Sequence, residues 1–166
     1  MTDEMADGPG YAIADDGSFT APLNLAYPYS RTVGPIYGAF LTGLANHKVG
    51  ATVSADGTVF VPPAEFHAST GERLDNWVDV ANEGEVVSWS WEADPDDSQP
   101  LNRPFAWVLV RLDGADTAML HALDVTDTSS VRTGMRVRVR WAADAEPGIH
   151  AIACFEPVEI AGGGPS

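Results

Sequence analysis

The chain has 166 residues with 24 acidic and 9 basic side chains, which give a net charge of −15 at pH 7. This length fits one ordinary domain, or a small domain with an appended module, and excludes two large domains. The acidic side chains are spread along the sequence and repel phosphate backbones, which disfavours general nucleic-acid binding. Cys154 is the single cysteine, so the chain has no internal disulfide and no cysteine-built zinc site. We expect Cys154 to be a buried small hydrophobe in a reducing compartment.

No stretch of the sequence approaches the roughly 20 apolar residues that a membrane span requires. The N-terminus, Met1-Thr2-Asp3-Glu4, also lacks the basic start of a signal peptide. These features predict a cytoplasmic protein that does not enter a membrane.

The two ends of the chain carry no sustained hydrophobic period. Residues 1–28 are rich in Asp, Gly, Ala and Pro, and residues 161–166 contain three consecutive glycines, so both segments are predicted to be flexible. The first periodic segment begins near Tyr29 and continues through Ile36, Phe40 and Leu44, with Pro35 near a helix start. It predicts one short amphipathic helix. Its glycines weaken an isolated helix, so it needs to pack on the domain behind it or on another chain.

After the helix the pattern changes to short β segments. The turn signal Ala55-Asp56-Gly57 precedes the strand-like Val59-Phe60-Val61, and Pro62-Pro63 ends it. This pattern predicts a small hairpin module, so that residues 29–80 hold the helix and this hairpin.

Five further β segments follow between residues 81 and 160, separated by turn-rich stretches. Five antiparallel strands of this size predict a small closed barrel, because closure removes the exposed edges. Residues 127–131, between the third and fourth segments, are placed to form a short helix or turn. The five predicted strands are Glu85–Glu92, Phe105–Leu112, Thr117–Val125, Met135–Trp141 and Ile149–Phe155.

Alternation along these strands assigns their two faces. In the first strand, Val87, Trp89 and Trp91 are predicted to share one side. In the fourth strand, the apolar residues share one side and the arginines face water or a partner on the other. The apolar set is Met135, Val137, Val139 and Trp141, and the arginines are Arg136, Arg138 and Arg140.

The order and spacing of several blocks resemble a known family. The blocks are Asp56–Pro63, Gly84–Trp91, Arg103–Gly114, Arg132–Val137 and Cys154–Pro157. Together they resemble the zinc-ribbon and OB-fold accessory proteins, long labelled a domain of unknown function, that accompany thiolases and lipid-transfer-type thiolase homologues. The resemblance covers about residues 29–158. It implies a mainly β fold with an N-terminal helix, a metal-free ribbon-like hairpin within 29–80 and a five-stranded OB-fold barrel at 81–160.

The chain departs from that family at the metal site. The positions of the family's two Cys-x-x-Cys knuckles fall on Val53 and Asp56 and on His67 and Thr70. A tetrahedral zinc site needs four thiolate or imidazole-class ligands, and neither Val53 nor Thr70 supplies one. We therefore expect no zinc and no metal role for His67.

Catalytic motifs are scarce in the sequence. It has no Gly-x-Ser-x-Gly elbow, phosphate-cradling glycine loop or His-Glu-x-x-His sequence. His121 and Asp124 are three positions apart on a predicted strand and point to opposite faces, so they do not form an acid-base pair. We expect no catalytic residues and no cofactor bound by this chain alone.

Candidate binding residues lie in three places. Trp89 and Trp91 are either barrel core or a stacking surface for an adenine ring or a partner side chain. Arg136, Arg138 and Arg140 either face solvent or meet coenzyme A phosphates or an acidic partner. The proline-bearing loop 98–104, which contains Asn102 and Arg103, is the place where contacts are expected first.

The family resemblance implies an accessory subunit that docks on a thiolase-like or lipid-transfer protein in a hetero-oligomer. Such a subunit helps to form the channel for a coenzyme A thioester, and the partner holds the catalytic acids and bases. The cysteine-less versions resemble actinobacterial pairs that serve steroid side-chain breakdown by retro-aldol cleavage. Two alternatives remain: an OB-fold single-stranded nucleic-acid-binding protein, and a stand-alone acyl-CoA hydratase or thioesterase.

Overall fold

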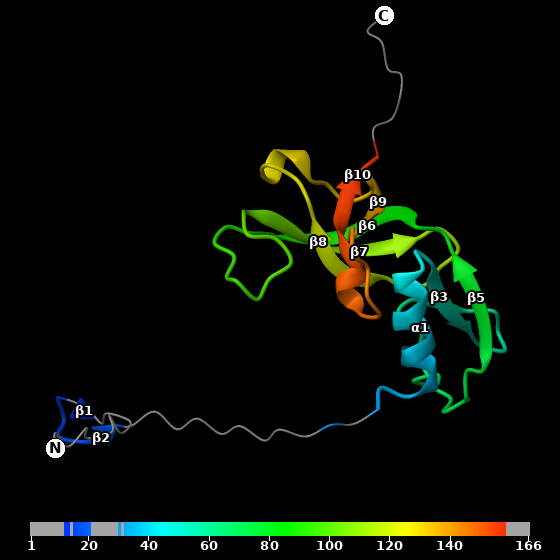
Figure 1. Cartoon of the computed structure of the whole chain (residues 1–166), viewed down its shortest axis with the longest axis horizontal. Coiled ribbons are helices and arrows are strands. Elements are labelled where there is room, and N and C mark those ends of the chain that lie inside the picture. Colours follow the sequence, from blue (N-terminus) through cyan, green and yellow to red (C-terminus); the bar gives the residue numbers. More distant parts are fainter. Residues whose placement is uncertain (1–11, 14, 21–29, 31, 159–166) are drawn as a thin grey trace, which may run out of the picture. The chain divides into compact units, whose positions relative to one another are not determined.

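The computed structural model describes residues 12–13, 15–20, 30 and 32–158 (Figure 1). Its contacts divide the chain into two units, residues 1–32 and 33–166. The described part of the first unit is a hairpin of β1 (Ala12–Ile13) and β2 (Phe19–Thr20), which the sequence pattern did not predict. Its turn includes Gly17 at φ 80°. The rest of the two predicted flexible segments, 1–28 and 161–166, lies outside the described residues.

The second unit begins with the predicted helix, α1 (Pro35–Ala45), which has proline in its first turn. Phe40 and Leu44 are its buried residues, and they pack in the main core. After the helix, His47 adopts a left-handed φ of 58°, and its ring stacks on Trp141 of the barrel at a centroid distance of 5.0 Å. The helix therefore packs on its own domain, which is one of the two packing partners expected for a glycine-rich helix, the other being another chain.

The ribbon-like module is a three-stranded antiparallel sheet in the order β4-β3-β5. β3 (Val49–Val53) lies between β4 (Val59–Phe60) and β5 (Asn76–Val80). Gly50 leaves room for the ring of Trp77, because a Cβ there would lie 1.9 Å from Trp77 Cζ2. The predicted hairpin is present, and β5 extends it.

The barrel closes in the strand order β10-β8-β7-β6-β9, as the OB-fold prediction required. The short 3-10 helix η1 (Thr128–Ser130) lies between β8 and β9 and is capped by the Asp127 carboxylate. A second 3-10 helix, η2 (Ile149–Ala151), replaces the start of the predicted last strand. The barrel strands are β6 (Glu83–Glu92), β7 (Phe105–Leu112), β8 (Met119–Leu123), β9 (Arg136–Trp141) and β10 (Ile152–Pro157).

Two sequence predictions about the barrel are wrong in detail. The ring is not wholly antiparallel, because β10 pairs with β8 in parallel through Phe155 and Leu123. In β6 the register shifts between Val86 and Ser88, which buries Val86 and leaves Val87 exposed. Val87 therefore does not belong with Trp89 and Trp91, since an extra residue at a bulge interrupts the alternation of faces. The alternation in β9 is confirmed, with Val137 and Val139 buried and the arginines outside.

One hydrophobic core connects the helix, the small sheet and the barrel, with members such as Leu44, Ala51, Val61 and Val137. Hydrogen bonds also join Val61, the residue after β4, to the turn between β7 and β8. The Val61 amide donates to Thr117 Oγ1 at 2.7 Å, and the Thr117 hydroxyl donates to the Val61 carbonyl at 2.9 Å. Packing and hydrogen bonds thus fasten the ribbon-like sheet to the barrel.

Candidate functional site

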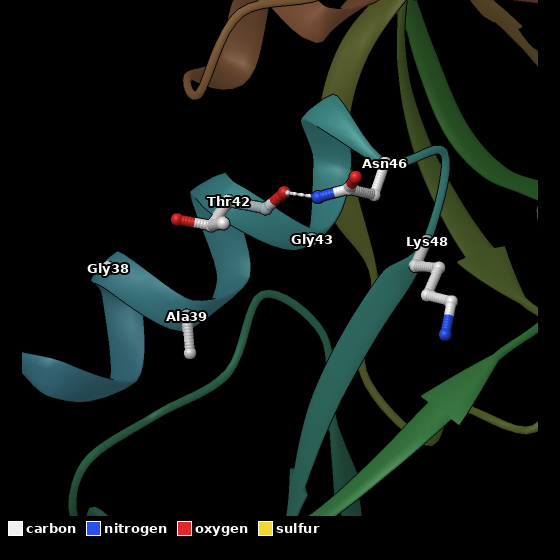
Figure 2. A pocket seen from close by; sticks show the side chains of 6 residues that line it. All are labelled: Gly38, Ala39, Thr42, Gly43, Asn46 and Lys48. Carbon is white, nitrogen blue, oxygen red and sulfur yellow. Dashed lines mark hydrogen bonds between the residues drawn. The ribbon is translucent and has the colours of Figure 1, made fainter.

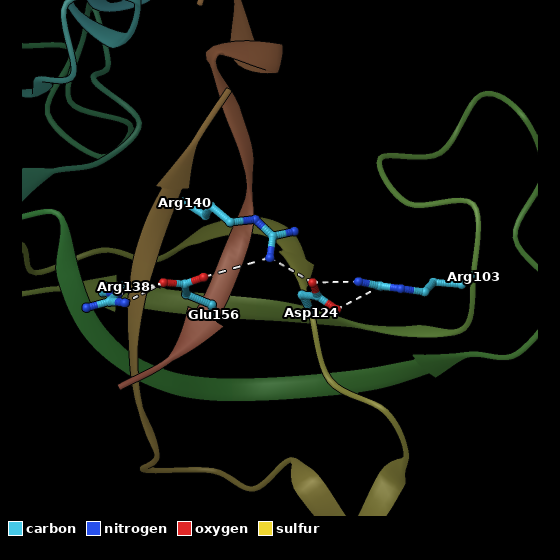
Figure 3. A network of polar contacts seen from close by, with 5 residues as sticks. All are labelled: Arg103, Asp124, Arg138, Arg140 and Glu156. Atoms are coloured by element: carbon cyan, nitrogen blue, oxygen red, sulfur yellow. Dashed lines mark hydrogen bonds and ion pairs between the residues drawn. The ribbon is translucent and has the colours of Figure 1, made fainter. Parts of the chain in front are cut away.

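Ion pairs connect the end of the loop before β7 to β9 and β10 (Figure 3). Arg103 donates to both carboxylate oxygens of Asp124, at 2.8 and 2.7 Å. Arg140 Nη1 donates to Asp124 Oδ2 at 2.8 Å and lies 3.7 Å from Glu156 Oε2. Arg138 Nε donates to Glu156 Oε1 at 2.7 Å. We call these five residues the arginine network.

The arginine network lies beside two neighbouring hollows of about 530 and 270 Å³, both lined by Asp124, Val125 and Thr126. Its three guanidinium groups outnumber its two carboxylates, which leaves one excess positive charge on a chain of net charge −15. Toward the described residues Arg140 uses only Nη1 in these pairs, which leaves Nε and Nη2 as donors in this part of the chain. Such donors suit an anionic oxygen ligand.

Arg136 belongs to a separate ion pair. Its Nη1 and Nη2 donate to the two oxygens of Asp113 at 2.7 and 2.6 Å, and Glu83 lies 3.8 Å away. The hydrogen bond from Arg136 holds the pKa of Asp113 below its usual value, and the pKa of Arg136 is raised by the same bond. Arg136, Arg138 and Arg140, which the sequence predicted to share one face of β9, therefore belong to two separate sites. Each of them is paired with an acidic side chain.

The two tryptophans of β6 have different surroundings. Trp91 is partly buried and packs against the main core, whereas Trp89 is 37% exposed. Trp89 lines a groove of about 190 Å³ with Ser88, Ser90, Trp107, Leu109 and Leu120. Asn102 is exposed in the loop before β7 and does not line this groove.

The four positions that correspond to the family's zinc ligands do not fit a metal ion. Val53 lies in β3 and pairs with Val59 and Asn76. Asp56 accepts hydrogen bonds from the Ser54 hydroxyl and the Thr58 amide, and its pKa is lowered to about 2, chiefly by the Ser54 bond. His67 Nδ1 accepts from the amides of Ser69 and Thr70 at 3.3 Å, and Thr70 Oγ1 accepts from the Glu72 amide at 3.3 Å. Local turns use the polar groups at these positions.

We expect the purified protein to contain no stoichiometric zinc. A structural zinc ion contributes folding free energy, so removing one from a ribbon lowers the melting temperature. Because these turns are closed by protein groups, treatment with a chelator should leave the melting temperature unchanged. Elemental analysis after dialysis checks the zinc content. One zinc per chain, or a chelator-induced fall in melting temperature, would contradict this prediction.

Two potentially reactive side chains are buried. His121 is 4% exposed, its ring lies 6.2 Å from that of Phe155, and its Nδ1 has no hydrogen-bond partner among the described residues. Burial lowers its pKa. Cys154 is fully buried, as predicted, and burial raises the pKa of its thiol to about 11. Asp124 is bound by Arg103 and Arg140, and no hydrogen bond joins it to His121, in agreement with the opposite faces expected from the sequence.

The outer face of α1 borders a shallow hollow of about 600 Å³ beside the start of β3 (Figure 2). Its lining is small or polar, and Asn46 Nδ2 donates to the Thr42 carbonyl at 2.8 Å. This face permits close approach of another surface but carries no group that identifies a ligand. The lining residues are Gly38, Ala39, Thr42, Gly43, Asn46 and Lys48.

The closed five-stranded ring, with a parallel pair between its third and fifth strands, places the chain in the class of OB-fold proteins. Residues 77–142 match the family model described as the C-terminal OB-fold domain of ChsH2. Over these residues the chain is similar to the OB-fold domain of ChsH2, which confirms the OB-fold part of the resemblance.

Two of the solved structures that match this chain share its fold. A protein of unknown function from the DUF35 family of Sulfolobus solfataricus is 21% identical with a TM-score of 0.52, and the match covers 64% of this chain and 78% of that chain. The second is described as the Ltp2-ChsH2(DUF35) aldolase. It is 21% identical with a TM-score of 0.55, and the match covers 76% of this chain and 98% of that chain. No curated protein matches the sequence. Among the described residues, no helix is long and apolar enough to cross a membrane.

Proposed function

We propose that this chain is a non-catalytic accessory subunit that docks on a thiolase-like, lipid-transfer-type protein and completes an acyl-CoA enzyme. The observation that carries the proposal is the match of residues 77–142 to the OB-fold domain of ChsH2. The likeness to the Ltp2-ChsH2(DUF35) aldolase, which covers 98% of that chain, supports the same role, because that protein is named as a complex of two components.

The chemistry of the described side chains is consistent with a non-catalytic role. Acyl-CoA chemistry needs a positioned nucleophile or base and donors for a developing oxyanion. His121 and Cys154 are buried, the environment of each favours its uncharged form, and Asp124 is occupied by two arginines. The catalytic acid and base are therefore assigned to the partner. The substrate that we propose is an acyl-CoA thioester such as that of a steroid side chain. It is a β-hydroxyacyl-CoA if the cleavage is a retro-aldol reaction, and a β-ketoacyl-CoA if the cleavage is thiolytic.

The test is co-expression with each thiolase-like protein encoded in the same genome. We expect one of them to form a stable complex that cleaves or condenses an acyl-CoA thioester, while either subunit alone is inactive or insoluble. Size-exclusion chromatography reports assembly. An aldehyde or ketone product reports retro-aldol cleavage, consumption of free coenzyme A reports thiolysis, and its release reports condensation. Robust turnover by the isolated chain, free of any partner, would overturn the accessory role. Tight binding of single-stranded oligonucleotides at low salt would favour the nucleic-acid alternative.

Within this proposal, the arginine network is the place where the chain meets coenzyme A phosphates. Replacing Arg140 with methionine keeps an unbranched apolar stem and removes the guanidinium donors, while Arg103 still binds Asp124. Charge-assisted hydrogen bonds to phosphate contribute about 1.5–3 kcal/mol, so Arg140→Met and Arg138→Met should each raise KM of the complex at least about tenfold.

The matched control is Arg136→Met, because Arg136 is engaged by Asp113 outside the network. We expect this control to change KM less than twofold. The effect of the network variants should also shrink as salt is raised, because the arginines are largely exposed. Equal KM values for all three variants at low salt would show that the network does not contact the substrate.

A further inference from the structure

An apolar groove lies on the outer surface of the barrel, on the neighbouring strands β6, β7 and β8. Leu109 and Leu120 face each other across β7 and β8, and Ser88 of β6 pairs with Leu109 on its other side. Leu120 is 58% exposed and Leu109 38% exposed. Among the described residues, Leu120 is the most exposed large apolar side chain. We call the hollow formed by Ser88, Trp89, Ser90, Trp107, Leu109 and Leu120 the β6–β8 groove.

The composition of the β6–β8 groove excludes several ligands. None of its six lining residues is charged, although the chain has 33 acidic and basic side chains in total, 24 and 9 respectively. A groove for single-stranded nucleic acid combines stacking aromatics with basic side chains that follow the phosphates. Trp89 and Trp107 supply aromatic surface here, but no lysine or arginine lines the groove. Phosphate-bearing ligands thus find no counter-charge in it.

Charge also argues against a second copy of the chain as the occupant. Each copy carries a net charge of −15, so pairing two copies brings like charges together. β6 ends at Glu92, two residues after Ser90 of the groove. The loop that follows contains Asp94, Asp96 and Asp97, and we call it the acidic loop. The surface that complements this region has apolar side chains that fill the groove and basic side chains opposite the acidic loop.

We propose that the β6–β8 groove is the docking surface for the thiolase-like partner, which inserts apolar side chains between Trp89, Leu109 and Leu120 and places basic side chains against the acidic loop. This inference rests on the proposed function and adds to it the surface of this chain that contacts the partner. Exposed apolar side chains that gather in one hollow mark interaction sites, and a few buried anchors carry most of the binding free energy of an interface.

Thiol labelling tests the groove with little disturbance, because Cys154 is the single cysteine and is fully buried. Leu120→Cys places one accessible thiol in the groove, and Val78→Cys places one on β5, where Val78 is 39% exposed. The partner is the thiolase-like protein selected by the co-expression test. In the complex, maleimide labelling at position 120 should slow at least tenfold relative to the free chain, while labelling at position 78 is unchanged.

Affinity provides the second measurement. Leu120→Asp should weaken the complex about 100-fold, as expected when a charge enters an interface anchor site, while Leu120→Met weakens it less than threefold. Because Leu120 is largely exposed in the free chain, the melting temperature of Leu120→Asp should stay within a few degrees of the original. Raising salt should weaken the wild-type complex, since the acidic loop contributes charge pairs.

The outcomes separate the two proposals. If a complex forms but Leu120→Cys labels equally fast in it, the docking surface is elsewhere and the accessory role stands. If no thiolase-like protein of the genome forms a complex, the accessory role itself fails. Concentration-dependent protection of position 120 in the free chain would assign the groove to a second copy, and protection by a single-stranded oligonucleotide would assign it to nucleic acid. Either result overturns the inference.

Discussion

Replacing Gly84 with alanine is expected to lower the free energy of unfolding by about 3 kcal/mol, the upper end of the range for overpacked interiors. Gly84 pairs with Leu112 of β7 on one side and Val137 of β9 on the other, so it lies where β6 is shared between two strands. A Cβ there would lie 2.2 Å from the Arg111 carbonyl oxygen and 2.7 Å from Leu112 Cα. These neighbours are backbone atoms, so relief requires the strands to separate.

Urea unfolding followed by tryptophan fluorescence measures this effect. Gly148→Ala is the matched control, because Gly148 is only partly buried and a Cβ there has no atom within 4 Å. We expect the control to change the free energy of unfolding by less than about 0.5 kcal/mol. If Gly84→Ala is as stable as the control, the close crossing of β6 and β7 is not a feature of the folded barrel.

The second large effect is a loss of stability in mild acid caused by His121. Burial places the folded-state pKa of His121 below the usual value of 6.5, and the positive charge of His150 lowers it further. The unfolded chain therefore binds this proton more readily than the folded chain. Stability is fully present above about pH 6.5 and falls by up to about 1.4 kcal/mol per pH unit as the pH drops from there toward the folded-state pKa.

His121→Leu should remove this dependence, because leucine is apolar, similar in size and leaves no unpaired Nδ1. Urea unfolding at pH 7.5 and pH 5 gives the comparison, with His150→Gln as an exposed control that keeps most of the slope. The aspartates with lowered pKa values, such as Asp113 and Asp127, stabilise the fold above about pH 3.8 and lose this effect only in stronger acid. An unchanged slope between pH 6.5 and pH 5 in His121→Leu would refute the role of His121.

The local elements could be read from the sequence because their signals are local. Pro35 and the spacing of Ile36, Phe40 and Leu44 predicted α1, which begins at Pro35. Phe105–Leu112 was predicted with the bounds of β7. The alternation of valines and arginines assigned both faces of β9, because side chains of a strand alternate whatever the strand pairs with. The missing donors at Val53 and Thr70 could likewise be recognised from residue type alone.

Only the tertiary structure decided which groups meet across the barrel. The bulge that exposes Val87, the parallel pairing of β8 and β10 and the groove between Trp89 and Leu120 depend on neighbouring strands. The acidic partners of the arginines depend on neighbouring strands too, because each lies 16 to 23 positions away in the sequence. The pairs are Arg136 with Asp113, Arg138 with Glu156, and Arg140 with Asp124. Alternation in the sequence tells on which face of a strand a side chain lies. Whether its charge is neutralised depends on which second strand lies beside it, and the sequence pattern does not show that. The sequence thus determined the elements and their faces, and barrel closure determined which charges are paired and which apolar side chains remain exposed.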